Sequence, residues 1–217
     1  RLKVAASLDG RTALANGKSQ WITGAAARRD GHAWRARACA VLTGIGTVRD
    51  DDPRLTVREV PTDRQPLRIL VDSRLELPPD ARLLDGGPLL VVGAVADAGR
   101  RAALEARGAE VLLLPNADGK VDLPALMTEL GRRELNEVHV EAGVKLNGSL
   151  VREGCVDEYL IYLAPMLIGD TGAGMFALPE LAGLDAARRL KIHDLRRVGD
   201  GLRFLARAAG TPAKGPA

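Results

Sequence analysis

The chain has 217 residues, of which 46% are hydrophobic and 27% are charged, so it can bury one sizeable core but is short for a second full domain. Its 31 basic and 28 acidic residues are mixed along the chain and give a net charge of +3, which argues against a nucleic-acid-binding protein. No apolar run approaches the roughly 18 residues of a membrane span, and we expect a cytoplasmic protein without a membrane partner.

A series of short apolar runs rich in Val, Ile and Leu predicts β-strands, with helical segments between them. This alternation favours parallel strands joined by crossover helices on both faces of one sheet. The expected strands are residues 2–7, 40–44, 67–72, 89–93, 110–115, 137–143, 158–165 and 202–207. The expected helices are residues 25–38, 97–109, 123–135 and 146–154.

The last two expected strands, 158–165 and 202–207, have no comparable helix between them. An antiparallel edge is therefore expected, and the predicted fold is α/β with a mixed, mostly parallel sheet and helices on both faces. We expect residues 1–207 to form a single domain. Residues 208–217, rich in Gly, Pro and Ala, predict a disordered tail.

Two strand-to-helix turns carry glycines. The strand 40–44 runs into Gly44 and Gly46, and the strand 137–143 ends at Glu141 with Gly143 opening the turn. Glycine lets backbone N–H groups approach a phosphate, and a helix start adds its dipole. A lone Gly-x-Gly is equally consistent with a plain tight turn, and the full G-x-G-x-x-G pattern is absent. Two such turns in one sheet predict a ligand with more than one phosphate across the carboxyl ends of the strands.

Ser73 and Arg74 follow the expected strand 67–72. An NAD site usually places a carboxylate at such a strand end, whereas a hydroxyl beside a cation suits the 2′-phosphate of NADP. The pattern favours NADP. The alternative is a turn hydroxyl beside a solvated arginine.

His139 and Glu141 spell the H-x-E that opens a zinc deaminase signature, and their spacing places both on one face of a strand. The P-C-x-x-C pair that supplies the remaining ligands is absent, so we expect no metal. We expect His139 to be a partly exposed strand histidine. His32 and His193 have no neighbouring residues that would complete a catalytic triad.

A phosphorylated substrate needs two or three convergent cations. Arg35 lies among several arginines on the expected helix 25–38, most of which we expect to face solvent, and Arg54 and Arg58 follow the first glycine turn. Bidentate arginines would hold such a substrate in a defined pose.

Five motifs, in this order and at this spacing, are similar to those of one known family. They are KVAASLDGRTA, SQWIT, GIGTVRDDDPRLTVR, ILVDS and VEAGVKLNGSL. They resemble the reductase domain of bacterial bifunctional riboflavin-biosynthesis deaminase/reductases, from about Leu2 to Arg207. This sequence carries Arg49 and Asp50 where an aliphatic and a small residue would be expected.

The resemblance implies a dihydrofolate-reductase-like fold and NADPH-dependent reduction of 5-amino-6-(5-phosphoribosylamino)uracil to its ribitylamino counterpart. It also implies a homodimer, and a deaminase domain preceding this one in a full-length chain. Two alternatives stay open: another reductase of this fold, acting on dihydrofolate or on the diaminopyrimidine before deamination, and a non-catalytic NADP-binding module. Asp51, Lys3 and Glu141 argue against the second alternative.

Carried over position by position, the resemblance also implies site residues. The cofactor-binding residues would be Ala5, Trp21, Thr47, Asp51, Ser73, Gly143, Val144, Lys145, Leu146, Asn147, Gly148 and Ser149. The substrate-binding residues would be Ser19, Arg35, Leu55, Arg58 and Glu141. Asp51 and Lys3 are the candidates for proton transfer. We expect Ser19 and Trp21 to alternate on a strand-like segment between both ligands, with the aromatic ring packed on the cofactor.

Overall fold

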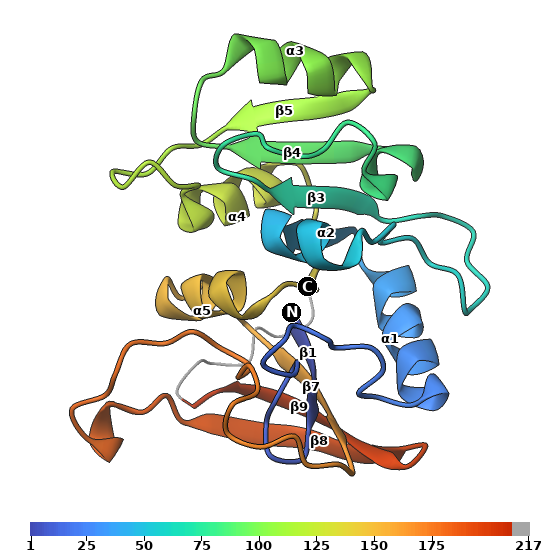
Figure 1. Ribbon diagram of the computed structural model, residues 1–217, viewed down its shortest axis with the longest axis vertical. Helices are drawn as coiled ribbons and strands as arrows, with labels where there is room; N and C mark the ends of the chain where they lie inside the picture. Colours follow the sequence, from blue (N-terminus) through green and yellow to red (C-terminus); the bar gives the residue numbers. More distant parts are fainter. Residues whose placement is uncertain (210–217) are drawn as a thin grey trace.

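The computed structural model describes residues 1–209, which form one nine-stranded mixed sheet with helices on both faces (Figure 1). The strands are β1 (Leu2–Ser7), β2 (Ala40–Gly44), β3 (Leu67–Val71), β4 (Leu89–Gly93), β5 (Ala109–Leu113), β6 (Val138–Val140), β7 (Tyr159–Ala164), β8 (Leu190–Val198) and β9 (Gly201–Ala208). The helices are α1 (Ala25–Arg37), α2 (Ile45–Asp51), α3 (Ala98–Ala106), α4 (Leu123–Arg132) and α5 (Val144–Arg152), with 3-10 turns η1 (Arg82–Asp85) and η2 (Leu184–Ala186).

The strand order is β5-β4-β3-β2-β6-β1-β7-β9-β8. Pairing is parallel from β5 across to β7, and β9 pairs antiparallel with both β7 and β8. The predicted mixed sheet with an antiparallel edge is therefore confirmed. Strand β9 continues to Ala208, one residue into the expected tail, and residues 210–217 of that tail lie outside the described part of the chain.

Two elements were not among the predicted ones. Strand β8 is mostly exposed and rich in charged residues, because an edge strand with a solvent-facing side needs no continuous apolar run. Helix α2 is a two-turn helix that begins directly after Gly44, where only a tight turn and a helix start were expected. Helices α3 and α4 begin as their sequences predict, with Asp97 and Asp122 accepting N-cap hydrogen bonds from Arg100 N and Ala125 N.

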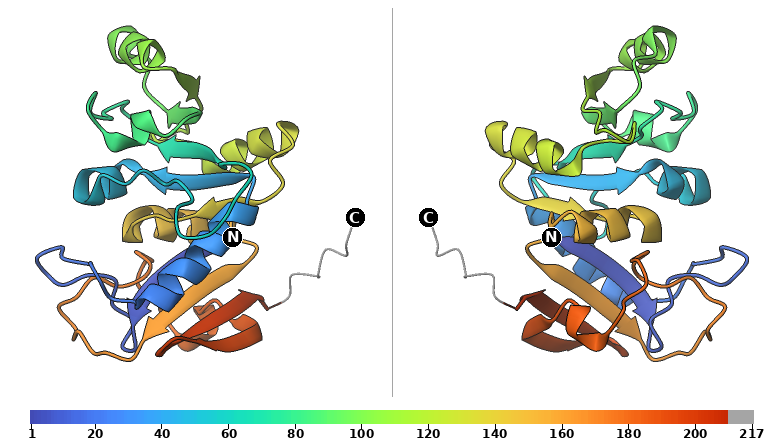
Figure 2. Two further views of the ribbon diagram at one scale, coloured as in Figure 1. Left: turned by 90° about the vertical axis from the view of Figure 1, so that its right-hand side faces the viewer. Right: turned by 90° about the vertical axis from the view of Figure 1, so that its left-hand side faces the viewer.

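The two faces of the sheet are packed differently. On one face, α4 and α5 cover a continuous apolar cluster that includes Leu42, Leu126 and Leu150. On the other face there are two separate clusters, one under α2 and α3 and one under α1. Figure 2 shows α2 and α4 on opposite sides of the sheet. Between these two clusters lie Lys3 on β1, His139 on β6 and Glu141 directly after β6, and we call this group, with its partner Arg35 from α1, the polar seam.

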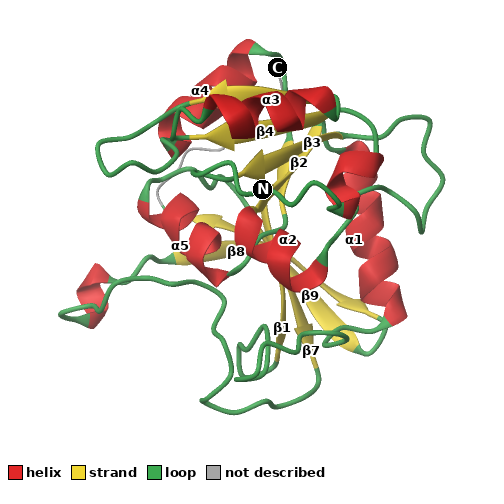
Figure 3. Ribbon diagram, turned by 45° about the horizontal axis from the view of Figure 1, so that its top comes forward, coloured by secondary structure: helices red, strands yellow, loops and turns green. Residues whose placement is uncertain are grey.

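Two long loops follow β1 and β7 and run side by side (Figure 3). Ala13 and Ala173 form an isolated antiparallel bridge between them. Asp9 in the first loop accepts hydrogen bonds from the backbone N–H groups of Ile168 and Gly169 in the second. The Ser7 hydroxyl and the Gly169 N–H lower the pKa of Asp9 to about 2, so the carboxylate stays ionised and the loops stay joined.

Among residues 1–209, no helix has both the length and the apolar character needed to cross a bilayer. Within the same residues, no group of three or more His, Cys, Asp or Glu side chains is placed to hold a metal ion.

Candidate active site

The two glycine-bearing turns lie against each other at the carboxyl ends of β2 and β6, which are paired in parallel. A Cβ atom on Gly44 would lie 2.9 Å from Leu146 Cδ2, and one on Gly143 would lie 3.7 Å from Thr47 Oγ1. The structure thus brings together Thr47, Gly143 and Leu146, three of the predicted cofactor residues. A side chain at position 44 would press against the Leu146 side chain, so glycine lets the two turns pack closely.

The first turn of α5 presents the unbonded N–H groups of Val144 and Lys145, as any helix start does. Asn147 is 2% exposed; its Nδ2 lies 3.4 Å from the carbonyl oxygen of Met175, while its Oδ1 has no partner among the described residues. Gly148 lies directly under the loop after β7, because a Cβ there would be 2.2 Å from the carbonyl oxygen of Ala177. The predicted residues Val144 to Asn147 therefore surround the turn, whereas Gly148 packs against the loop.

Ser149 lies further along α5, where its hydroxyl accepts a hydrogen bond from Arg152 Nη2. Ala5 shares the α1 face of β1 with Lys3 and is paired with Tyr162 of β7. These placements do not test the predicted cofactor roles of Ser149 and Ala5, which stay predictions.

The segment that holds Trp21 is a turn-rich loop, and the predicted strand-like alternation of Ser19 and Trp21 is wrong. Gly17 in this loop has φ +85°, which breaks any extended run. Trp21 is 67% exposed, which also excludes a core role, and the Arg28 guanidinium lies 4.4 Å from its ring centroid. Ser19 is half-buried, and its hydroxyl makes no hydrogen bond within residues 1–209.

Asp51 lies at the C-terminal end of α2, close to the Trp21 loop. Its Oδ1 accepts a hydrogen bond of 3.3 Å from Gln20 Nε2, so two predicted cofactor residues, Asp51 and Trp21, are neighbours. Lys3 is paired with Glu141 and not with Asp51. The structure therefore does not place the two proton-transfer candidates in one ion pair.

Ser73 directly follows Asp72 at the end of β3, as predicted. Its hydroxyl accepts a hydrogen bond of 3.3 Å from the Val121 N–H. The Arg100 guanidinium donates to the carbonyl oxygen of Arg74 at 2.8 Å. Arg100 of α3 therefore bonds the backbone of the residue directly after Ser73.

Two of the predicted substrate-side residues, Arg35 and Glu141, meet in the polar seam. Arg35 donates from Nε to Glu141 Oε1 at 2.8 Å, and its Nη2 lies 2.8 Å from the same oxygen. Lys3 Nζ lies 3.8 Å from Glu141 Oε2. Arg35 Nη1 also donates to the carbonyl oxygen of Thr56 at 2.6 Å, which connects the ion pair to the segment that carries Leu55 and Arg58.

Burial alone would raise the pKa of Glu141, but Arg35, Lys3 and His139 more than offset it and hold the pKa well below the ordinary value. The carboxylate is therefore ionised. The three fixed cations nearby, Arg35, Lys3 and Arg58, exceed its single negative charge, so the seam can accept an anionic ligand.

His139 is completely buried, and the prediction of a partly exposed histidine is wrong. The reason is that β6 lies in the middle of the sheet, between β2 and β1. The predicted common face is confirmed, because His139 Nε2 lies 3.4 Å from Glu141 Oε1. Burial lowers the pKa of His139, so it is neutral.

Leu55 and Arg58 lie on an irregular segment outside any helix or strand. Leu55 has φ +55°, and its side chain is buried in the cluster under α2. The Arg58 N–H donates to His32 Nδ1 at 3.2 Å, and Arg58 Nη1 donates to Thr56 Oγ1 at 3.2 Å. Burial, with Arg35 and Arg58 nearby, lowers the pKa of His32 to about 4. His32 lies one helical turn before Arg35, a spacing from which its place on the same face could have been read.

Tyr162 is a second residue that the sequence motifs missed. Its hydroxyl donates to Asp30 Oδ2 at 2.6 Å, and Lys3 Nζ lies 6.0 Å from its ring centroid. At this distance the ring face and the Lys3 ammonium can form a cation–π contact. Only the alternation of β7, which places Leu160 and Tyr162 on the α1 face, could have indicated it.

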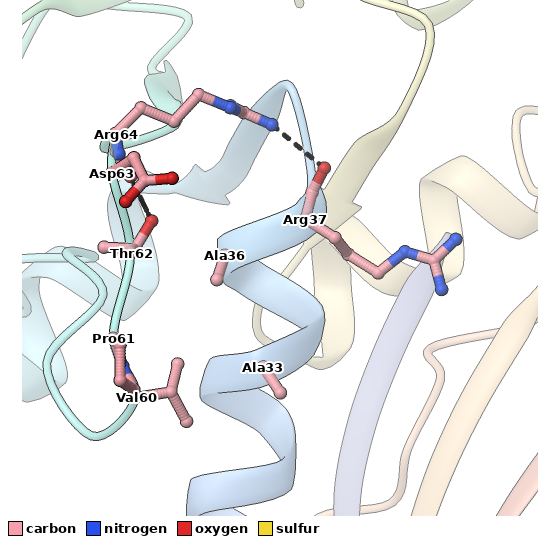
Figure 4. Close-up of a pocket in the computed structure, with 8 residues that line it drawn as sticks. All are labelled: Ala33, Ala36, Arg37, Val60, Pro61, Thr62, Asp63 and Arg64. Atoms are coloured by element: carbon pink, nitrogen blue, oxygen red, sulfur yellow. Dashed lines mark hydrogen bonds between the residues drawn. The ribbon is translucent and has the colours of Figure 1, made fainter.

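An open hollow of about 470 Å³ lies elsewhere, between α1 and the loop before β3 (Figure 4). It is lined by Ala33, Ala36, Arg37, Val60, Pro61, Thr62, Asp63 and Arg64. None of the predicted site residues lines it. It is near the end of α1 that leads into the amino end of β2, whereas the glycine turns are at the carboxyl ends of the strands.

The chain is similar to known proteins over most of its length. Residues 1–204 match the family model described as RibD C-terminal domain. The chain is 40% identical over 211 residues to riboflavin biosynthesis protein RibD of Escherichia coli (strain K12), covering 92% of this chain and 57% of that protein. The solved structure of Acinetobacter baumannii RibD, form 1, has a TM-score of 0.84 and 35% identity, over 96% of this chain and 57% of that one.

A solved Thermotoga maritima protein has a TM-score of 0.80 at 24% identity, over 96% of this chain and 56% of that one. It is named a diaminohydroxyphosphoribosylaminopyrimidine deaminase/5-amino-6-(5-phosphoribosylamino)uracil reductase. These neighbours share the dihydrofolate-reductase-like fold that the motifs implied. The chain spans little more than half the length of these relatives.

Proposed function

Because the chain belongs to the RibD C-terminal domain family, we propose that it is a pyrimidine reductase of riboflavin biosynthesis. Its substrate is 5-amino-6-(5-phosphoribosylamino)uracil, its product the ribitylamino counterpart, and its cofactor NADPH. The observation that carries the proposal is the ionised Glu141 held between Arg35 and Lys3, with Arg58 close by, beside the two glycine turns. Cations suit the substrate phosphate, and the carboxylate suits its polar groups.

The residues around the glycine turns fit a dinucleotide. Gly44 and Gly143 let the two turns pack closely, and the first N–H groups of α5 suit a pyrophosphate. The buried Oδ1 of Asn147, without a partner in the described chain, suits a hydroxyl or amide hydrogen. Ser73 with Arg74 and Arg100 favours a 2′-phosphate, and so NADPH over NADH.

The cofactor, when bound, supplies the hydride to the ribosyl C1′ after the sugar ring has opened to an imine. The chain must then place C1′, hold the phosphate, help the proton leave the amine nitrogen and reach the ring oxygen as the ring opens, and supply one further proton to the imine nitrogen as the hydride reaches C1′. Arg35 and Arg58 hold the phosphate. Lys3, kept in place by Glu141 and the Tyr162 ring, is one candidate proton donor, and Asp51 is the other.

The test is an assay of NADPH consumption with each of the two pyrimidines and with dihydrofolate. Turnover with the deaminated pyrimidine supports the proposal, turnover only with another substrate indicates a different reductase of this fold, and no turnover indicates a binding module.

We expect Arg58→Ala to raise KM for the pyrimidine tenfold or more, because the variant loses one charge-assisted hydrogen bond to the substrate phosphate. Asp51→Asn should lower kcat. Parent values of kcat and KM in both variants would refute this site.

A further inference from the structure

The segment Leu55–Arg58 carries two of the proposed substrate residues but belongs to no strand. Its backbone polar groups are bonded by side chains instead of by a neighbouring strand. The side chains that do this come from α1 and from the chain just before β3. They are His32, Arg35 and Gln65.

Gln65 pairs with both backbone groups of Val57. The Val57 N–H donates to Gln65 Oε1 at 2.7 Å, and Gln65 Nε2 donates to the Val57 carbonyl oxygen at 3.1 Å. One side-chain amide thus takes the place of a residue on an adjacent strand, which would offer the same acceptor and donor. Val57 itself is buried, so neither group could be left to solvent without cost.

His32 bonds the backbone of the next residue, Arg58. Its Nδ1 accepts the Arg58 N–H at 3.2 Å, and its side chain is buried on α1. Because its pKa is lowered to about 4, the Nδ1 lone pair is free at neutral pH. Arg35, one helical turn further along α1, bonds the Thr56 carbonyl oxygen, so α1 holds this segment at two points.

The loop that follows this segment does not supply the same restraint. After Arg58 the chain leaves α1 as the loop 59–64, and the hollow shown in Figure 4 separates this loop from Ala33 and Ala36. Arg64 bonds the loop back to the end of α1, through the carbonyl oxygens of Arg37 and Ala38. The position of residues 56–58 therefore depends on side-chain hydrogen bonds more than on the loop beneath them.

We propose that Gln65 and His32 are positioning residues of the active site, which hold the backbone of Val57 and Arg58 and so fix the direction of the Arg58 guanidinium. Neither residue needs to touch the substrate. The inference rests on the proposed function in one respect, that Arg58 binds the substrate phosphate.

The first experiment compares Gln65→Leu with Thr62→Ala. Leucine is similar in size but removes both bonds to Val57, whereas the Thr62 hydroxyl bonds only Arg64 within the same loop. We expect Gln65→Leu to raise KM for the phosphorylated pyrimidine about tenfold, with kcat and KM for NADPH changed by less than about twofold. Thr62→Ala should leave all three at parent values. Gln65→Glu, which keeps the acceptor, should lie between and serves if the leucine variant does not fold.

The second experiment uses His32→Leu and His32→Asn. We expect His32→Leu to raise KM for the phosphorylated pyrimidine. Asparagine offers an oxygen in place of Nδ1, so His32→Asn should bring KM most of the way back to the parent value, which would not happen if His32 only filled space.

A double variant separates positioning from stability. In an Arg58→Ala background, Gln65→Leu should cause no further rise in KM, because the group it positions is gone. An equal rise in both backgrounds would overturn the inference. Parent KM in Gln65→Leu and in His32→Leu, while Arg58→Ala raises KM, would overturn the inference alone. Parent KM in Arg58→Ala would overturn the proposed phosphate contact and the inference with it.

Discussion

The cofactor side and the substrate side of the proposed site differ in what holds them in shape. Around Gly44 and Gly143 the glycine backbone packs against the side chains of Leu146 and Thr47. Around Glu141 they are ion pairs and hydrogen bonds between long side chains, set between two apolar clusters. The first region should be sensitive to added volume and the second to lost charge, and the following substitutions test that contrast.

The largest effect is expected for Glu141→Ala. It leaves Arg35 and Lys3 partly buried without their carboxylate, which should cost about 3 kcal/mol of unfolding free energy and lower kcat/KM at least about 100-fold. The measurements are urea unfolding and steady-state kinetics.

The matched control for Glu141→Ala is Glu110→Ala. Glu110 pairs with Arg133 at the same 2.8 Å, but its side chain is 58% exposed. This substitution should change the unfolding free energy by less than about 1 kcal/mol and leave turnover unchanged. Equal behaviour of the two variants would remove the distinction between the substrate side and an ordinary surface pair.

A second effect on the substrate side depends on pH. The pKa of His32 is about 4 in the folded protein against 6.5 for a free histidine, so the unfolded chain takes up the proton first as pH falls. His32 should therefore stabilise the protein above pH 6.5 and lose this contribution between pH 6.5 and pH 4, by at most about 3 kcal/mol. Unfolding measured across this range should show a shallower loss in His32→Asn than in the parent. Parallel curves of unfolding free energy against pH for the parent and His32→Asn would contradict this prediction.

The same contrast explains what could be predicted from sequence. Strands in the sheet interior are mostly apolar and were predicted; β8 was not, because it is an edge strand with many exposed charged residues. The glycine turns and the common face of His139 and Glu141 follow from local spacing. The burial of His139 does not, because it depends on which strands flank β6. Nor does the pairing of Gln65 with Val57, since an irregular segment has no periodicity from which a partner could be read.

The smallest effect is expected on the cofactor side, for Gly148→Ala compared with Gly131→Ala. Both glycines lie in helices, α5 and α4. A Cβ on Gly148 would be 2.2 Å from the backbone oxygen of Ala177, so the loop after β7 must move away, at a cost of about 2 kcal/mol. On Gly131 it would meet nothing within 4 Å, and alanine should stabilise the helix by up to about 1 kcal/mol.

The loop displaced by Gly148→Ala also bonds Asn147, so this variant should raise KM for NADPH more than KM for the pyrimidine. Gly131→Ala should change neither. If Gly148→Ala instead raised KM for the pyrimidine more than KM for NADPH, the loop after β7 would belong to the substrate side. Thermal unfolding of both variants, recorded with and without NADPH, separates loss of the fold from loss of the cofactor site.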